Sequence, residues 1–236
     1  GDWENDVASS AAIVDKSGRV QAYAAFTDSV CRAASERFVP VKENGTWHYY
    51  DCESGAFTDE TYDEAAAVTD SVAAVKQGAV WHLKNIVDGT EADTAFTDVK
   101  LFDTGEYVYD GNLLAAENGV YGLYTQKGKK ASEIPGTAVD VYRGEAIAFR
   151  AESGLWGFAD AKGKVVIEPQ YENAKSFSGH MAAVCMDGLW GFVNTDGKLV
   201  IDCQYADAGY FNADGVCFVS MIEGSYFPIT LRFPQK

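Results

Sequence analysis

The chain has 236 residues, with 35 acidic and 19 basic side chains and a formal net charge of −16. This charge excludes partners that need a basic face, such as nucleic acids and anionic membrane surfaces. A hydrophobic fraction of 47%, with 23 glycines against 5 prolines, argues against disorder and favours a turn-rich all-β fold, and no apolar run is long enough to span a bilayer.

The chain begins GDWEN, without an initiator methionine, a basic segment or an apolar segment. This start indicates a truncated or mature chain, and removal of a signal peptide or a lipid-attachment leader would explain it. The stretch AAIVDKSGRV at residues 11–20 is the first strand-like segment, and no clear strand precedes it.

A large aromatic residue recurs along the chain at nearly constant spacing. Starting from Ala11, the equivalent positions are Trp47, Trp81, Tyr121, Trp156, Trp190 and Tyr226. Successive intervals average about 36 residues, and such a period is the signature of a repeat architecture. We therefore predict one repeat domain over residues 1–236, made of six units and a partial C-terminal unit.

Within one unit, turn residues separate three strand-like segments. The segments AAVCM at 182–186 and LWGFV at 189–193 flank Gly188, which suits a tight hairpin turn. A second turn, NTDGK at 194–198, leads into the strand LVI. The following Y-x-x-A-x-x-F pattern predicts one helical turn or an irregular crossover. Each unit is thus a three-stranded meander that must stack on its neighbours to bury its apolar face.

Two segments carry a recognisable motif, GLWGFADAKGKVVIEPQYENAKSF from Gly154 and GLWGFVNTDGKLVIDCQYADAGYF from Gly188. They resemble the WG-repeat family, and the match is specific over residues 113–222. In residues 1–112 the units are degenerate, because Ala12, His48 and His82 replace the glycine that follows the tryptophan. Residues 223–236 form a terminal cap. The resemblance implies a bacterial, β-rich repeat protein that is often secreted or surface-attached and has no catalytic residues to transfer.

Two arrangements of the units fit the sequence. A propeller-like ring typically needs four to eight blades, and the unit count falls in that range. An open twisted stack of β-hairpins, a solenoid, is the alternative. The last stretch, VCFVSM followed by YFPITL, is strand-like but lacks the second turn of a unit. The first stretch lacks a preceding strand, so the two ends are incomplete in complementary ways. Complementary ends favour a ring slightly.

The five cysteines, Cys31, Cys52, Cys185, Cys203 and Cys217, have no C-x-x-C spacing. We expect them to be small apolar core residues rather than zinc ligands or a disulfide framework. His48 and His82 share one repeat position, but a metal site needs a third ligand. We expect these histidines to fill space where glycine is absent, and we predict no metal and no cofactor.

Candidate recognition residues are aromatic. The tryptophan column is expected to form core between stacked units, not a sugar-stacking ladder. The 40-residue interval holds an insertion, DTGEYVYDGN, in which Tyr107 and Tyr109 alternate with polar residues and could share one exposed face. Tyr49 and Tyr50 in the stretch WHYY are the other two candidates.

No nucleophile elbow, phosphate-binding loop or cysteine–histidine–aspartate spacing is present in the sequence. We predict a non-enzymatic binding or scaffolding module at the bacterial surface, extracytoplasmic and monomeric, with a protein or glycan partner. A carbohydrate-binding protein that uses exposed aromatics is one alternative, and a propeller-type glycoside hydrolase is the other. Acidic residues recur at turn positions, for example Asp51 and Asp160, so much of the negative charge is expected to be turn chemistry.

Overall fold

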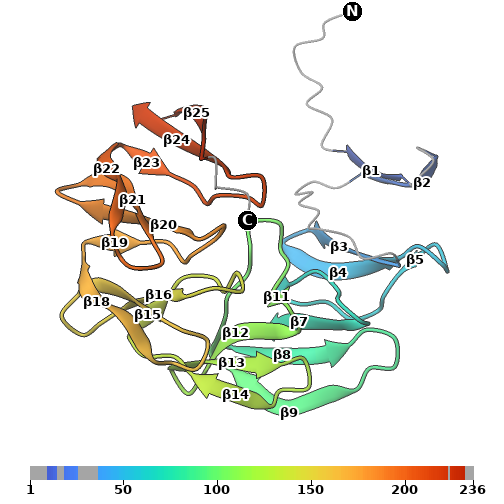
Figure 1. The fold of residues 1–236 in the computed structure, drawn as a ribbon. Helices are drawn as coiled ribbons and strands as arrows, with labels where there is room; N and C mark the ends of the chain where they lie inside the picture. The colour runs from blue at the N-terminus through green and yellow to red at the C-terminus, as the bar shows by residue number, and fades with distance from the viewer. Residues whose placement is uncertain (1–9, 15–18, 26–36, 223, 232–236) are drawn as a thin grey trace, which may run out of the picture. The chain divides into compact units, whose positions relative to one another are not determined.

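The computed structural model describes residues 10–14, 19–25, 37–222 and 224–231, and the described residues form strands and no helix (Figure 1). The chain divides into two compact units, Gly1–Tyr107 and Val108–Lys236. The all-β class predicted from the sequence is confirmed. In the described ranges, no helix has the length and apolarity to cross a membrane.

The first unit contains a hairpin and two small antiparallel sheets. The hairpin pairs β1 (Ser10–Val14) with β2 (Val20–Ala25). One sheet contains β3 (Phe38–Glu43), β4 (Thr46–Asp51) and β5 (Ala56–Phe57). The other contains β6 (Glu64–Ala65), β7 (Val72–Gln77), β8 (Val80–Asn85) and β9 (Glu91–Phe96), and the short strand β10 (Asp98–Val99) follows it.

The second unit contains four successive antiparallel meanders. The first comprises β11 (Val108–Tyr109), β12 (Asn112–Glu117), β13 (Val120–Thr125) and β14 (Lys130–Glu133). The second comprises β15 (Ala138–Val139), β16 (Ile147–Arg150), β17 (Trp156–Ala159) and β18 (Val165–Tyr171). The third comprises β19 (Asn173–Ala174), β20 (Met181–Met186), β21 (Leu189–Asn194) and β22 (Leu199–Tyr205). The last comprises β23 (Asp207–Ala208), β24 (Val216–Ile222) and β25 (Ser225–Thr230).

The hairpin turn predicted at Gly188 is present. Asp187 and Gly188 have φ angles of 51° and 74°, and they join β20 to β21 as a two-residue turn. Positive φ at both positions matches the twist of the flanking strands, and glycine adopts it without steric cost. The sequence therefore sets the register in which Cys185 pairs with Trp190.

The Y-x-x-A-x-x-F segment forms a crossover, and the helical alternative is not what is seen. Tyr171 ends β18, whereas Ala174 belongs to β19 and pairs with Val184 of the next sheet. The segment is extended because its backbone bonds to β20 rather than to itself. The second and third meanders of this unit thus each gain a two-residue strand ahead of the three strands predicted.

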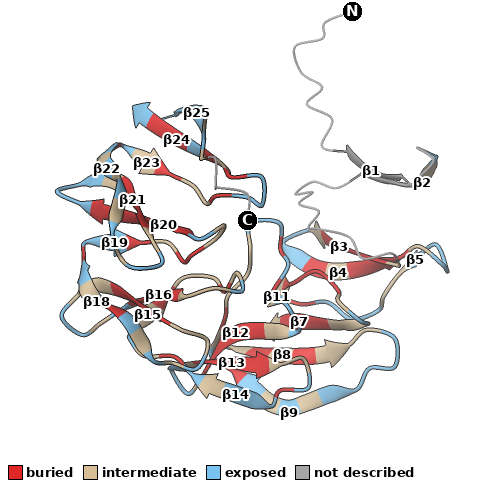
Figure 2. Cartoon of the chain, viewed as in Figure 1, coloured by how far each residue is buried: buried red, intermediate tan, exposed pale blue. Residues whose placement is uncertain are grey.

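The core lies between successive sheets. One cluster joins Phe158 and Ile167 of one meander to Phe177, Ala182 and Val184 at the next. The Phe158 and Phe177 rings meet edge to face with centroids 4.9 Å apart, and the next repeat holds Phe192 and Phe211 at the same distance. Buried residues concentrate in the middle strands, and the outer strands carry more exposed ones (Figure 2). Stacking of neighbours therefore supplies the burial that one meander lacks.

Candidate functional site

Two of the four candidate tyrosines lie in the core of the first unit. Tyr49 has no exposed surface, and its hydroxyl donates to the carbonyl of Ala66 at 2.8 Å. Tyr50 is buried, and its ring meets Phe57 edge-on with centroids 5.3 Å apart. Both side chains are buried inside the protein and present no surface to a ligand.

The insertion places its two tyrosines in different environments. Tyr107 is buried, and its hydroxyl donates to the carbonyl of Val72 at 3.0 Å. Tyr109 lies in β11 and is 45% exposed. The two do not share a face because β11 begins at Val108, so strand alternation does not extend back to Tyr107. Of the four candidates, Tyr109 alone reaches the surface.

The two histidines at the glycine position lie in different surroundings. His48 stacks on Phe57 with centroids 4.0 Å apart and an interplanar angle of 3°. Burial lowers the pKa of His48, and the nearby Glu43 carboxylate opposes that shift. His82 lies with Nδ1 3.7 Å from Glu91 Oε2. Across the described residues, no group of three or more His, Cys, Asp or Glu side chains is placed to hold a metal ion.

The tryptophan column is largely core. Trp47 and Trp81 are buried, and the half-buried Trp156 and Trp190 pack against the clusters between sheets. The expectation that this column packs between repeats is confirmed for Trp47, Trp156 and Trp190, and Trp81 is buried. It offers no exposed ladder of rings for a sugar chain.

Four of the five cysteines lie in described residues, and all four are free thiols. Cys185 and Cys217 are buried, whereas Cys52 and Cys203 are half-buried against apolar clusters. Burial raises the pKa of the Cys217 thiol to about 11. These cysteines are small core residues, as predicted. Cys31 lies outside the described residues.

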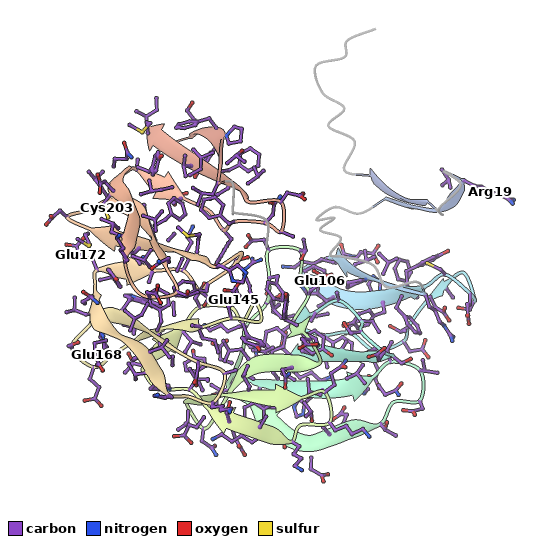
Figure 3. The ribbon with its side chains drawn as sticks, in the orientation of Figure 1. Arg19, Glu106, Glu145, Glu168, Glu172 and Cys203 are labelled. Carbon is purple, nitrogen blue, oxygen red and sulfur yellow. The ribbon has the colours of Figure 1, made fainter. Side chains whose placement is uncertain are left out.

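A shallow cavity of about 510 Å³ lies beside Tyr109 in the second unit. It is lined by Tyr109, Asp110, Arg143, Gly144 and Glu145. The first two residues come from the β11–β12 hairpin, and the other three come from the connection between β15 and β16. Glu145 is labelled in Figure 3. One loop of each of two adjacent meanders therefore contributes to the cavity.

The Tyr109 ring is fixed from behind. A Cβ atom at Gly144 would stand 2.4 Å from Tyr109 Cε1, so the ring lies directly against this glycine. Tyr142 meets the ring edge-on with centroids 6.0 Å apart. The ring therefore has a packed side and an open side.

The Arg143 guanidinium is held by an aromatic ring. Its Cζ lies 3.9 Å from the centroid of Tyr210, within the range of a cation–π contact. The Tyr210 hydroxyl lies 2.8 and 2.7 Å from the two Asp140 oxygens, and Asp140 Oδ2 also accepts the Ser176 backbone N–H at 2.6 Å. The arginine thus rests on a ring that is itself anchored.

Glu145 is held from the following repeat. The backbone N–H of His180 donates to Glu145 Oε1 at 3.0 Å, and the His180 ring Nδ1 lies 3.3 Å from Oε2. Both carboxylate oxygens therefore face His180. Glu145 and His180 are separated by 35 residues and follow equivalent glycines, Gly144 and Gly179, in consecutive units.

Sequence reasoning selected Tyr109 but missed Arg143 and Glu145. The two flank Gly144, and the neighbouring repeat has Ser178 and His180 at the corresponding positions. The signal in the sequence is that Arg143 and Glu145 carry opposite charges, whereas the corresponding positions of the neighbouring repeat hold serine and histidine.

A second cavity of about 300 Å³ lies in the first unit and is lined by Thr58, Asp59, Glu60, Tyr62, Lys84, Asn85, Ile86 and Gly89. Two of its charged groups, Glu60 and Lys84, bind one another. Lys84 Nζ pairs with Glu60 and, at 3.2 Å, with Glu91, and the Tyr62 hydroxyl donates to Glu60 at 2.6 Å. Burial, followed by the Glu60 carboxylate, raises the pKa of Tyr62. This internal pairing makes the Tyr109 cavity the stronger candidate.

The last meander exposes four large apolar side chains over more than half of their surface, here called the terminal apolar surface. They are Phe218, Met221, Ile222 and Tyr226, whereas Phe227 pairs with Val219 and its ring meets Tyr205 of the preceding meander. In the preceding meanders, Ala148 and Ala183 occupy the position equivalent to Phe218, and both are buried against the sheet that follows. Phe218 is 57% exposed, and no sheet follows it in the described part of the second unit.

Comparison with solved structures agrees with the fold. BamB from Moraxella catarrhalis superposes with a TM-score of 0.55 at 15% identity, covering 91% of this chain and 77% of that chain. The C-terminal WD40 domain of Sif2 gives 0.58 at 12% identity, covering 93% and 75%. Hsv2 from Kluyveromyces marxianus gives 0.52 at 14% identity, covering 85% and 71%. Because WD40 repeats build β-propellers, the likeness shows a propeller-like fold.

No curated protein matches the sequence. The family described as WG containing repeat matches residues 156–190 and 190–224, which confirms the resemblance drawn from the two GLWGF motifs. The chain therefore carries repeats of the WG family, in two tandem copies over residues 156–224.

Proposed function

We propose that the chain is a non-enzymatic binding module that contacts a protein partner at the bacterial surface. The WG repeats and the propeller-like fold support a repeat module for protein interaction. The surface location rests on the resemblance to a family whose members are often secreted. The single observation that carries the proposal is the terminal apolar surface.

Exposed apolar side chains in a strongly charged chain indicate a contact surface. Large apolar patches on soluble proteins commonly mark sites of interaction. Phe218, Met221, Ile222 and Tyr226 are each more than half exposed, although the chain has a net charge of −16. A phenylalanine replaces the buried alanine of the earlier repeats where a covering sheet is absent in the described part of the unit. A partner that covers Phe218 would restore the burial that its repeat neighbours obtain from the next sheet.

The backbone favours contact through side chains over strand addition. The Phe218 carbonyl accepts the Gly209 N–H at 2.8 Å, so it points towards β23. Pro228, which lies opposite Phe218 in the antiparallel register, therefore points its nitrogen away from β24 and towards the outer edge of β25. Proline has no N–H to donate to an added strand, and this blunts the edge.

Charge selects the class of partner. Two copies of a chain that carries −16 repel one another, so a second copy is a poor occupant. A protein with an apolar contact area and a net positive charge is attracted by the same field. We therefore assign the terminal apolar surface to a basic protein partner.

Photo-crosslinking tests this proposal. A benzoylphenylalanine group at residue 218, introduced in the cells that produce the chain, should give an adduct with one basic protein. The same group at Val166, 47% exposed on the outer strand β18, is the matched control and should not. With the purified partner, Phe218→Ser should weaken binding about tenfold or more, and added salt should weaken it further. Adducts between copies of the chain, or adducts at both positions alike, would contradict the proposal.

A further inference from the structure

We infer that the cavity beside Tyr109 is a binding site for a neutral saccharide. It is separate from the terminal apolar surface, so the inference does not depend on a protein partner being found there. The argument rests on the fixed aromatic ring, on the polar groups around it and on the balance of their charges.

Tyr109 provides a platform. Its ring is 45% exposed, and Gly144 and Tyr142 contact it from behind and at the edge. Tyrosine combines an apolar ring with a polar hydroxyl, which suits ligands that have both apolar and polar surface. A pyranose ring fits this description, since its C–H groups can lie on the aromatic face while its hydroxyls point outwards.

The polar lining matches hydroxyl groups. Asp110 and Glu145 carry carboxylates that accept hydrogen bonds, and the Arg143 guanidinium donates them. A sugar hydroxyl can donate and accept at once, so a polyol can use both kinds of group. Hydrogen bonds to charged partners are stronger than those between neutral groups.

The charges around the cavity disfavour charged ligands. Two carboxylates and one guanidinium give the lining a formal charge of −1, in a chain with a total of −16. A phosphate, a sulfate or an acidic sugar is repelled by that field. An amine is attracted by the carboxylates but also meets the Arg143 cation. A neutral polyol avoids both penalties.

The site is held in place before any ligand arrives. Arg143 rests on the Tyr210 ring, which Asp140 anchors, and Glu145 is held by His180. Asp110 lies in the two-residue turn between β11 and β12, with a φ of 48°. Because few side chains remain to be ordered, less conformational entropy is lost on binding.

The same geometry favours binding over hydrolysis. A glycosidase needs one carboxylic acid that protonates the leaving oxygen and a second carboxylate that acts as base or nucleophile. Both oxygens of Glu145 face His180, and Oε1 accepts the His180 backbone N–H at 3.0 Å. Glu145 is thus oriented as a hydrogen-bond acceptor, the role that binding a hydroxyl requires.

Saturation-transfer NMR and calorimetry with defined trisaccharides test the inference. The probes are maltotriose, cellotriose, mannotriose and tri-N-acetylchitotriose, with trigalacturonic acid and a lysine tetrapeptide as charged comparisons. At least one neutral probe should bind with a dissociation constant of about 1 mM or tighter. Tyr109→Ala should weaken its binding about tenfold or more, whereas Tyr109→Phe, which keeps the ring, should stay within about threefold.

Further variants separate the site from the fold. Glu145→Gln and Arg143→Lys should each weaken binding of the same probe, while the control Leu189→Ala, which removes another exposed apolar side chain of this unit, should leave binding unchanged. Melting curves check that each variant is folded. Binding of none of the neutral probes, binding that survives Tyr109→Ala, or preferential binding of the tetrapeptide would overturn the inference. Release of reducing ends from a bound probe would support the saccharide site and contradict the non-enzymatic function.

Discussion

Gly157 lies against the carbonyl oxygen of Ile167, so close that a Cβ atom at the glycine would stand 2.6 Å from that oxygen. Trp156 pairs with Tyr171 and Phe158 pairs with Ile167, which leaves one residue of β17 opposite three of β18. The outer strand bulges over the glycine, and Gly191 has the same arrangement with Ile201. The glycine of the W-G pair is there because a neighbouring backbone occupies the space of a side chain.

Gly191→Ala is expected to destabilise the protein by about 1–3 kcal/mol, since the added methyl group collides with backbone atoms that cannot rotate away. The nearest are Ile201 O at 2.5 Å and Cys203 N at 2.7 Å. Urea unfolding followed by circular dichroism measures the change. Gly209→Ala is the matched control, because its nearest atom lies at 3.2 Å and it should cost less. Equal losses for the two variants would argue against the close approach as the cause.

Asp160 tests whether the recurrent acids serve turns or recognition. Its Oδ1 accepts the backbone N–H groups of Lys162 and Lys164 at 2.9 and 3.0 Å, and Asn194 Oδ1 does the same in the next repeat. Asp160→Asn should therefore leave stability nearly unchanged, whereas Asp160→Ala should lower it by about 1 kcal/mol. Thermal melts of the two variants decide the matter, and a large loss in the asparagine variant would show that the charge itself is needed.

The ion pair between Asp51 and Arg37 predicts that the free energy of unfolding falls in acid. The Arg37 guanidinium donates two hydrogen bonds of 2.9 Å to this carboxylate and holds its pKa well below the ordinary value. Because the unfolded state takes up the proton first, the stabilisation is complete above the unfolded pKa of about 4 and declines as the pH falls below it. Free energies of unfolding between pH 6 and about pH 2 should fall less steeply in Asp51→Asn than in the parent chain. Parallel curves would mean that other carboxylates govern acid stability.

The buried hydroxyl of Tyr124 predicts that the protein loses stability at alkaline pH. Burial, followed by the Glu117 carboxylate, raises the pKa of its hydroxyl to about 12, and that hydroxyl donates to Glu117 Oε2 at 3.3 Å. A raised pKa in the folded state stabilises the protein fully below the unfolded value of about 10 and less as the pH rises towards 12. Melting temperatures above pH 10 should fall less in Tyr124→Phe than in the parent chain. An absorbance titration at 295 nm that shows every tyrosine ionising near the ordinary value would contradict this account.

The repeat register could be predicted because its cause is local. Gly188 indicates a two-residue turn, Asp160 indicates the turn that its own side chain stabilises, and β-branched residues indicate the strands. The spacing of these residues along the chain therefore predicts the meander. The crossover was harder to predict because Ala174 pairs with Val184, ten residues further on and in a different strand. The i, i+3, i+6 pattern of Tyr171, Ala174 and Phe177 serves two sheets and only resembles one helical turn.

The candidate site was only partly predictable for a similar reason. Tyr109 stood out within an insertion, but Tyr107 stands two residues before it and donates to Val72 inside the core. Arg143 and Glu145 belong to the meander that follows that of Tyr109, and no spacing in the sequence brings them to Tyr109. The three side chains come together because the two meanders stack, and this packing is not encoded in the spacing of residues along the chain.

The bulge over the glycine also bears on how such chains are recognised. In the first unit, β8 pairs His82 directly with Ala95, so no outer strand presses on that position and a side chain is tolerated. At Gly157 and Gly191 the tryptophan–glycine signature thus marks copies in which an outer-strand backbone occupies the space of a side chain, and not the meander as such. A survey keyed to that dipeptide will count residues 156–224 and pass over copies in which histidine follows the tryptophan, as it does at His48 and His82. Proteins scored with one or two such motifs can therefore contain longer arrays than their motif count suggests.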